Sequence, residues 1–228
     1  MKKGCIFDLD GTLVNSLKDL ALTTNKVLES HGLPTHDIEL YKQLVGNGVK
    51  KLMERALPLE NQDILEECLE QFHEIYEEHC LDYSCPYEGI KELVDWLYEN
   101  DYRLAVVTNK PHHIAVKIVE KLFPNRFITI LGQQNLYPIK PHPESTLIAL
   151  MAMKISKEEC YFIGDSNVDI QTGYEADMDT IGVSWGFRGR VELENEGATY
   201  VVDDPKEIKE IIHENRDKFM SGRNKMHI

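Results

Sequence analysis

Short apolar runs alternate with amphipathic stretches along most of this chain. The first run covers residues 4–7 and passes directly into Asp8 and Asp10. Continuous apolar runs of this length are typical of interior strands in a parallel sheet, which are buried on both faces. Later runs of the same kind predict further strands over residues 103–108, 127–131, 160–163, 180–183 and 200–202.

Helical patterns separate these apolar runs. They predict helices over residues 89–98, from Pro111 onward, and over residues 143–153 and 168–176. Strands that alternate with helices form a parallel sheet with helices on both faces, because each crossover helix packs back onto the sheet. The sequence therefore predicts an α/β fold with a doubly wound parallel sheet, a Rossmann-like core. Residues 221–228 have the composition of a polar tail.

The connection after the first strand is too long for a single crossover helix. Three helical stretches are expected in it, separated by glycine-containing and proline-containing breaks: a first one ending at Gly32, a second over residues 38–57 with a turn at 45–48, and a third over residues 62–80. We therefore predict an α-helical cap domain of residues 15–84, inserted into a core domain of residues 1–14 and 85–228.

The chain carries a strong net negative charge. It has 25 Lys and Arg against 39 Asp and Glu in 228 residues, which gives a formal net charge of −14 at pH 7. Nucleic acids and anionic membranes reward clustered positive charge, so both are disfavoured as partners. A small phosphorylated metabolite is compatible with this charge, because Mg²⁺, one lysine and helix N-terminal amides can hold a phosphate locally.

The cysteines and the apolar segments indicate the cellular compartment. The five cysteines include no C-x-x-C pair, which suits reduced thiols in a reducing compartment. No segment reaches the roughly 20 apolar residues of a membrane span. Met1-Lys2-Lys3 leads into a predicted strand rather than into the apolar part of a signal peptide. We therefore expect a cytoplasmic protein, whose oligomeric state the sequence leaves open.

Two predicted strands end in pairs of carboxylates. Asp8 and Asp10 follow the first strand, and Asp165 and Asp169 follow the strand at 160–163. Open α/β sheets bind ligands beyond the carboxyl ends of their strands, and carboxylates held close together favour a cation such as Mg²⁺. The adjacent Gly11 lets backbone amides approach an anion closely. Alternatively, Asp8 and Asp10 are ordinary turn residues and Asp165 caps the following helix.

Donors for an anionic ligand come from two further segments. Thr108 ends the strand at 103–108 and is followed by Asn109 and Lys110, so that a hydroxyl, an amide and an ammonium group lie at the same edge of the sheet. Lys140 lies between Ile139 and a proline, in a loop whose prolines restrict the backbone. The alternative is that these are polar turn residues and a solvated lysine.

Taken in order, these four segments resemble the haloacid dehalogenase superfamily of phosphotransferases. Asp8-Leu9-Asp10-Gly11-Thr12 is similar to its nucleophile loop, Thr108 to its phosphate-binding Ser/Thr, Lys140 to its charge-neutralising lysine, and Gly164-Asp165 with Asp169 to its metal motif. A helical insert after the first motif resembles that of the subclass with an α-helical cap.

The resemblance implies a role for each of these residues. Asp8 would be the nucleophile, and Asp10 the general acid and base. Mg²⁺ would be held by the Asp8 carboxylate, the Asp10 carbonyl and Asp165, with Asp169 orienting metal-bound water or Lys140. The phosphoryl oxygens would be held by Thr108, Asn109, Lys140 and backbone amides.

Within the superfamily, three segments resemble phosphoglycolate phosphatases most: residues 104–110, 164–166 and 182–186. Asn15 and Asp177 depart from that group, which usually has aspartate and glycine there. The resemblance implies a Mg²⁺-dependent phosphatase for a small phosphomonoester, with 2-phosphoglycolate the best single candidate. A phosphotransferase of the β-phosphoglucomutase type and a non-catalytic phosphate-binding protein of the same fold are the alternatives.

The cap turn is the expected source of substrate contacts. Capped relatives close the cap over the leaving group, so Asn47 and Lys50 are candidates for binding substrate, with an exposed helix lysine as the alternative for Lys50. Lys110 and Arg188 are further candidates for binding a second anionic group.

Overall fold

Six parallel strands form the central sheet, in the order β5-β4-β1-β6-β7-β8. This is seen in a computed structural model that describes residues 2–224, with side chains described through residue 214. The strands are β1 (Gly4–Phe7), β4 (Arg103–Pro111), β5 (Thr129–Gln133), β6 (Cys160–Gly164), β7 (Asp179–Val183) and β8 (Tyr200–Val202). The first strand lies in the middle of the sheet, so the carboxylates that follow it are central as well.

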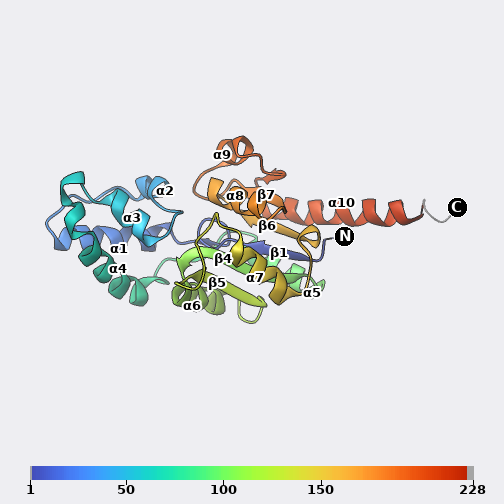
Figure 1. The fold of residues 1–228 in the computed structure, drawn as a ribbon, viewed down its shortest axis with the longest axis horizontal. Coiled ribbons are helices and arrows are strands. Elements are labelled where there is room, and N and C mark those ends of the chain that lie inside the picture. The colour runs from blue at the N-terminus through green and yellow to red at the C-terminus, as the bar shows by residue number, and fades with distance from the viewer. Residues whose placement is uncertain (1, 225–228) are drawn as a thin grey trace.

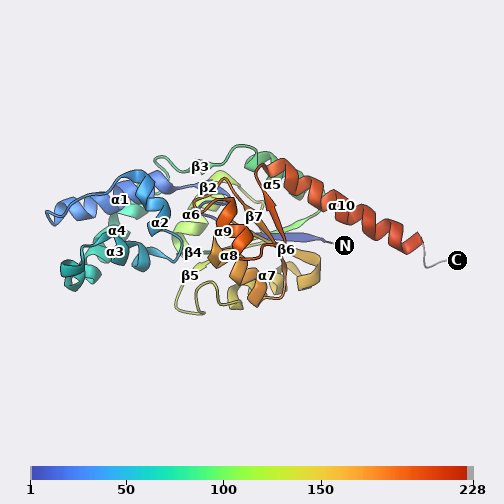
Figure 2. The same cartoon turned by 90° about the horizontal axis from the view of Figure 1, so that it is seen from above.

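Helices cover both faces of the sheet, because side chains alternate along each strand. Cys5 and Phe7 pack against α5 (Ile90–Glu99) and α6 (His112–Leu122), whereas Ile6 points to the opposite face and packs with α7 (Glu144–Met153). The remaining core helices are α8 (Asn167–Glu175), α9 (Arg190–Asn195) and α10 (Pro205–Asn224). Helix α10 begins beside α5 and runs out beyond the body (Figure 2).

A helical lobe follows β1 and lies at the end of the molecule opposite α10 (Figure 1). Its α-helices are α1 (Leu17–Ser30), α2 (Tyr41–Leu44), α3 (Val49–Ala56) and α4 (Leu65–His79), with two 3₁₀ segments, η1 (Ile38–Leu40) and η2 (Leu59–Ile64). The helices α1 and α4 pack together through apolar faces that include Ala21, Leu28, Phe72 and Tyr76.

The chain enters and leaves this lobe through two short strands that pair with each other. They are β2 (Val14–Asn15) and β3 (Cys85–Pro86), and they are antiparallel. Beside them, the buried Asp19 carboxylate of α1 accepts hydrogen bonds from the Tyr83 and Ser84 amides and from Ser84 Oγ, at 2.7–3.1 Å. The division into domains at residues 14/15 and 84/85 stays a prediction.

The predicted fold class is confirmed, and most predicted elements lie within two residues of the observed ones. Two predictions about boundaries are wrong. Asn109 and Lys110 belong to β4, which was predicted to end at Thr108, because Pro111 still pairs with Gln133 of β5. Residues 221–224 belong to α10 rather than to a tail, and residues 225–228 lie outside the described residues. In the described part of the chain, no helix has the length and apolar character to cross a bilayer.

Candidate active site

The carboxyl ends of three neighbouring strands bring the predicted residues together. Strand β1 pairs with β4 on one side and with β6 on the other. Asp8, Thr108 and Asp165 therefore meet at one edge of the sheet, as expected for a parallel sheet. All three side chains are buried.

Lys140 joins Asp8 to Asp169. Its Nζ lies 2.8 Å from Asp8 Oδ1 and 2.6 Å from Asp169 Oδ1, and its side chain is 3% exposed. The side-chain amide of Asn109 fixes the lysine backbone, because it accepts from Lys140 N at 2.8 Å and donates to Lys140 O at 3.1 Å. Burial disfavours the ammonium, but Asp169 and Asp8 outweigh that effect and raise the pKa of Lys140.

The loop after β6 holds Asp165 and Asp169 rigidly. Ser166 caps α8, and Asp169 Oδ2 accepts from Ser166 Oγ at 2.7 Å and from the Asp165 and Ser166 amides. The helix cap is therefore Ser166, and Asp165 has another task. Its Oδ2 accepts from the Phe187 amide at 2.7 Å, and its Oδ1 accepts from Thr12 Oγ1 at 3.2 Å.

Asp8, Asp165 and Asp169 suit a divalent cation. Each offers one carboxylate oxygen, and these oxygens lie within 4.8 Å of one another. Although Asp8 Oδ1 is at ion-pair distance from Lys140, it is buried and accepts no hydrogen bond from the described residues. Burial raises the pKa of Asp8 to about 7 and that of Asp165 well above its usual range, and repulsion from Asp169 adds to both shifts. An oxygen-binding cation such as Mg²⁺ fits this donor set, because it would offset the excess negative charge.

Asp10 has different partners from the cluster of Asp8, Asp165 and Asp169. Its carboxylate accepts from Lys110 Nζ at 2.9 and 3.1 Å and from Ser16 Oγ at 2.5 Å. Lys110 Nζ also donates to the Tyr76 hydroxyl at 2.6 Å. Because Tyr76 comes from α4, this contact joins the helical lobe to the core. Burial opposes the charged form of Lys110, but Asp10 and Tyr76 outweigh it and raise the pKa of Lys110.

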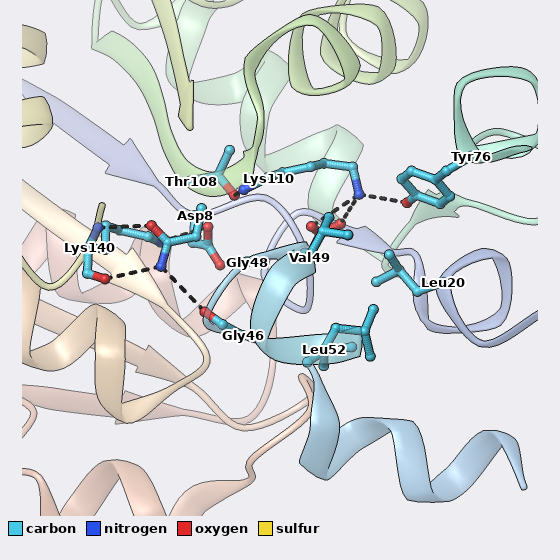
Figure 3. Close-up of a pocket in the computed structure, with 13 residues that line it drawn as sticks. Asp8, Leu20, Gly46, Gly48, Val49, Leu52, Tyr76, Thr108, Lys110 and Lys140 are labelled. Carbon is cyan, nitrogen blue, oxygen red and sulfur yellow. Dashed lines mark hydrogen bonds and ion pairs between the residues drawn. The ribbon is translucent and has the colours of Figure 1, made fainter. Parts of the chain in front are cut away.

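A small cavity lies between the core and the lobe (Figure 3). Its core side is formed by Asp8, Asp10, Thr108, Asn109, Lys110 and Lys140, and its lobe side by Leu20, Val45, Gly46, Gly48, Val49, Leu52 and Tyr76. Its volume of about 40 Å³ corresponds to about three or four water-sized groups. Asp8 and Lys140 lie at one end of the view, and Lys110 reaches toward Tyr76 at the other.

The structure does not bring every predicted residue to this cavity. Lys50 is exposed and pairs with Glu66 at 2.8 Å, and Asn47 accepts from Arg55 at 2.8 Å. Neither side chain is among the lining residues. The cap turn instead contributes the backbone of Gly46 and Gly48. Arg188 does not line the cavity either, because its Nη2 donates to the Val45 carbonyl at 2.9 Å.

The turn at 45–48 was expected to contact substrate, but the sequence reasoning missed the other lobe residues that line the cavity. Leu20, Val49 and Leu52 carry no chemical signal beyond an apolar helix face. Tyr76 carried one, because it lies four residues after Phe72 on the buried face of α4, and a buried tyrosine hydroxyl usually has a polar partner.

Gly11 has a role that the sequence did not suggest. It has a φ of +89°, and a Cβ there would lie 2.3 Å from Asp165 Oδ2. The absence of a side chain therefore makes room for the Asp165 carboxylate.

Comparison with known proteins identifies the family of this chain. The family model for haloacid dehalogenase-like hydrolases matches residues 5–183, a range that contains the four carboxylates, Thr108 and both lysines of the cavity. The chain therefore belongs to the haloacid dehalogenase-like hydrolases, as its sequence motifs indicated.

Within this family the chain is an enzyme similar to phosphoglycolate phosphatases. The phosphoglycolate phosphatase of Haemophilus influenzae is 34% identical over 90% of this chain and 96% of that protein. The N-acetylmuramic acid 6-phosphate phosphatase of Pseudomonas aeruginosa is 31% identical over 92% of this chain and 94% of that protein. A crystal structure assigned as a phosphoglycolate phosphatase of Lactobacillus delbrueckii subsp. bulgaricus has a TM-score of 0.88 and 33% identity, and covers 93% of this chain and 99% of that one.

Proposed function

We propose that this protein hydrolyses a small phosphomonoester with Mg²⁺, through an aspartyl-phosphate on Asp8, and that 2-phosphoglycolate is its substrate. The observation that carries the proposal is the Asp8 carboxylate, which is buried at one end of the cavity beside Lys140, with Asp165 and Asp169 close by. A nucleophile, a cation site and a fixed ammonium group are the parts that phosphoryl transfer requires.

In the first half-reaction, an Asp8 oxygen attacks phosphorus. A bond forms between Asp8 and phosphorus, the bond from phosphorus to the ester oxygen breaks, and Asp10 gives a proton to the departing alkoxide. Asp10 lines the same cavity, and Lys110 and Ser16 hold its carboxylate in place. Thr108 and Lys140 line the cavity near Asp8 and would hold phosphoryl oxygens.

In the second half-reaction, water attacks the phosphorus of the aspartyl-phosphate. Asp10 now takes a proton from that water, the bond between phosphorus and the Asp8 oxygen breaks, and inorganic phosphate leaves. Mg²⁺ held by Asp8, Asp165 and Asp169 would supply positive charge that lets the anionic substrate approach the carboxylate.

Two further observations support parts of the proposal. The curated relatives named phosphoglycolate phosphatase support 2-phosphoglycolate as the substrate. The five free cysteines, four of them buried, are consistent with a cytoplasmic location.

Phosphate release from a panel of phosphomonoesters, with Mg²⁺ and with excess chelator, tests the proposal. We expect release from 2-phosphoglycolate that chelator abolishes. Asp8→Asn should lower turnover by at least about 10⁴-fold without unfolding the protein, because no other group can form the acyl phosphate. Asp63→Asn, an exposed aspartate of the lobe, is the matched control and should keep its activity.

Three results would contradict the proposal. They are robust activity in Asp8→Asn, full activity in chelator, and no release from any ester. Interconversion of sugar phosphates without phosphate release would favour a mutase instead.

A further inference from the structure

The cavity contains two buried lysines that differ in how their charges are balanced. Lys140 lies between two carboxylates, at 2.8 Å from Asp8 and 2.6 Å from Asp169. Lys110 is equally buried, with 2% of its side chain exposed, but it contacts one carboxylate, that of Asp10. The place of a second carboxylate is taken by the neutral hydroxyl of Tyr76.

The Tyr76 hydroxyl is a second hydrogen-bond donor beside the Lys110 ammonium. It accepts a hydrogen bond from Lys110 Nζ, so its own proton points elsewhere, and no acceptor for that proton is found among the described residues. The tyrosine is 1% exposed and lines the cavity. An ammonium and a hydroxyl 2.6 Å apart together form a site that one carboxylate group could bridge.

The other side chains of the lobe wall are apolar. They are those of Leu20, Val45, Val49 and Leu52, and the backbone of Gly46 and Gly48 completes the wall. Hydroxyl groups of a sugar or of glycerol that packed against these side chains would lose water without finding partners, which costs free energy. Lys110 and Tyr76 provide the polar side-chain contact at this end of the cavity.

The position of Lys110 also limits where the charge of the substrate lies. Lys110 Nζ is 2.9 Å from Asp10 Oδ1, and Asp10 must reach the ester oxygen to protonate it. An anion bound to Lys110 is therefore close to the ester oxygen. A substrate carboxylate lies at such a position when it is attached to the carbon that carries the ester oxygen.

From these contacts we infer that Lys110 and Tyr76 form a carboxylate subsite, so that the substrate is a phosphomonoester with a carboxylate on the carbon next to the ester oxygen. This inference rests on the proposed function. It adds a contact for the leaving group and assigns it to Tyr76 of the lobe and Lys110 of the core.

A comparison of three phosphate esters separates the effect of the leaving group's charge on activity from the effect of its size. The esters are 2-phosphoglycolate, ethyl phosphate, which has a methyl group in place of the carboxylate, and 3-phosphonooxypropanoate, which moves the carboxylate one carbon away. We expect kcat/KM for 2-phosphoglycolate to exceed that for ethyl phosphate by about 10²-fold or more, which is typical when one partner of a buried charge pair is missing. The longer acid should lie between them.

Two variants test the assignment to residues. In Lys110→Met, the ratio of kcat/KM for 2-phosphoglycolate to that for ethyl phosphate should fall by about 10²-fold, and in Tyr76→Phe by about tenfold. A disturbance of Asp10 would lower both activities and cancel in the ratio. Competitive inhibition by glycolate should weaken in parallel with the ratio.

Matched controls come from the lobe. Tyr41→Phe removes another buried hydroxyl, which donates to Asn25 at 2.6 Å and does not line the cavity. Lys50→Met removes the exposed lysine that pairs with Glu66. Both should leave the ratio within about twofold of that of the wild type.

An unchanged ratio in both Lys110→Met and Tyr76→Phe would overturn the subsite. A wild-type enzyme that hydrolyses ethyl phosphate as well as 2-phosphoglycolate would overturn it too, while leaving the phosphatase proposal intact. If Lys110→Met does not fold, Tyr76→Phe still decides between these results. Absence of phosphate release from all three esters would instead contradict the proposed function.

Discussion

At the scale of single residues, Asp165 shows how closely the site is constructed. Two glycines lie against Asp165. A Cβ at Gly11 would lie 2.3 Å from Asp165 Oδ2, and a Cβ at Gly186 would lie 2.3 Å from Asp165 Cβ. Real side chains do not approach this closely. The carboxylate can therefore reach the cluster with Asp8 and Asp169 only because neither neighbour has a side chain.

Asp177 illustrates a departure that the structure explains. It follows α8 with a φ of +55°, and the Met178 amide donates to the Gly173 carbonyl at 2.9 Å. A left-handed residue after a helix is usually glycine or asparagine. Aspartate tolerates this conformation better than most residues, and here its carboxylate also pairs with Lys157.

Asp10 is the residue whose proposed roles can be separated by experiment. If it protonates the alkoxide and later activates water, Asp10→Asn should slow both half-reactions unequally. An aryl phosphate has a good leaving group and needs little acid assistance, so its first step should survive, while water attack still lacks its base. We predict a burst of about one phenolate per active site, then slow turnover.

Acid quench followed by intact-mass measurement should detect the phosphoryl group retained on Asp8. Ser16→Ala is a useful companion, because it removes one hydrogen bond to Asp10 and keeps the carboxylate. It should slow turnover without a burst. Equal losses on aryl and alkyl esters in Asp10→Asn, with no burst, would contradict the acid and base role.

At the scale of elements, the cap turn is held against the core by two side chains. Arg188 Nη2 donates to the Val45 carbonyl at 2.9 Å, and Asn109 Nδ2 lies 3.5 Å from the Gly46 carbonyl. Within the lobe, Arg55 holds the same segment through the Leu44 carbonyl and Asn47. Arg188 therefore joins the core to the lobe, whereas Arg55 makes its contacts within the lobe.

This pair of arginines predicts how cap closure affects binding. Arg188→Met should raise KM by up to about fivefold with little change in kcat, because losing about 1 kcal/mol of contact across the boundary lowers the closed population. Arg55→Met should change KM by less than about twofold. Hydrogen exchange of the amides at 45–48 should quicken in Arg188→Met, and equal KM shifts in both variants would contradict this account.

The elements show where sequence reasoning succeeded and where it could not. Asp8 and Asp165 were predictable because carboxylates after neighbouring parallel strands must meet at one sheet edge. The end of β4 was not, because its extension depends on pairing between Pro111 and Gln133, which is not local in sequence. The contact of Lys110 with Tyr76 depends on how the lobe packs on the core, so spacing alone could not predict it.

At the scale of the whole molecule, the chain combines an acidic surface with a buried acidic cluster. The net charge of −14 is screened at the surface, whereas Asp8, Asp165 and Asp169 lie where water cannot screen them. Lys140 balances part of this charge. Folding without a cation therefore has to bury excess negative charge, which links stability to pH and to Mg²⁺.

The sign of this linkage follows from Asp8 and Asp165. Burial raises the pKa of Asp8 to about 7 in the folded protein, against about 3.9 in an unfolded chain. The folded state therefore binds more protons between these values, so the free energy of unfolding should fall as pH rises from about 4 to about 7. The raised pKa of Asp165 acts in the same direction and extends the fall to higher pH.

Denaturant unfolding in chelator, measured from pH 5 to 8, tests this linkage. Asp8→Asn removes one titrating group, so the stability of this variant should fall less over this range than that of the wild type. The surface groups that titrate are the same in both proteins, so their effect cancels in the comparison. Mg²⁺ at about 100 times its dissociation constant should then add about 2.7 kcal/mol to the wild type near pH 8. It should add much less to Asp8→Asn, which has lost a ligand. Parallel pH curves and equal Mg²⁺ effects for the two proteins would show that the carboxylate cluster does not determine the stability of the metal-free fold.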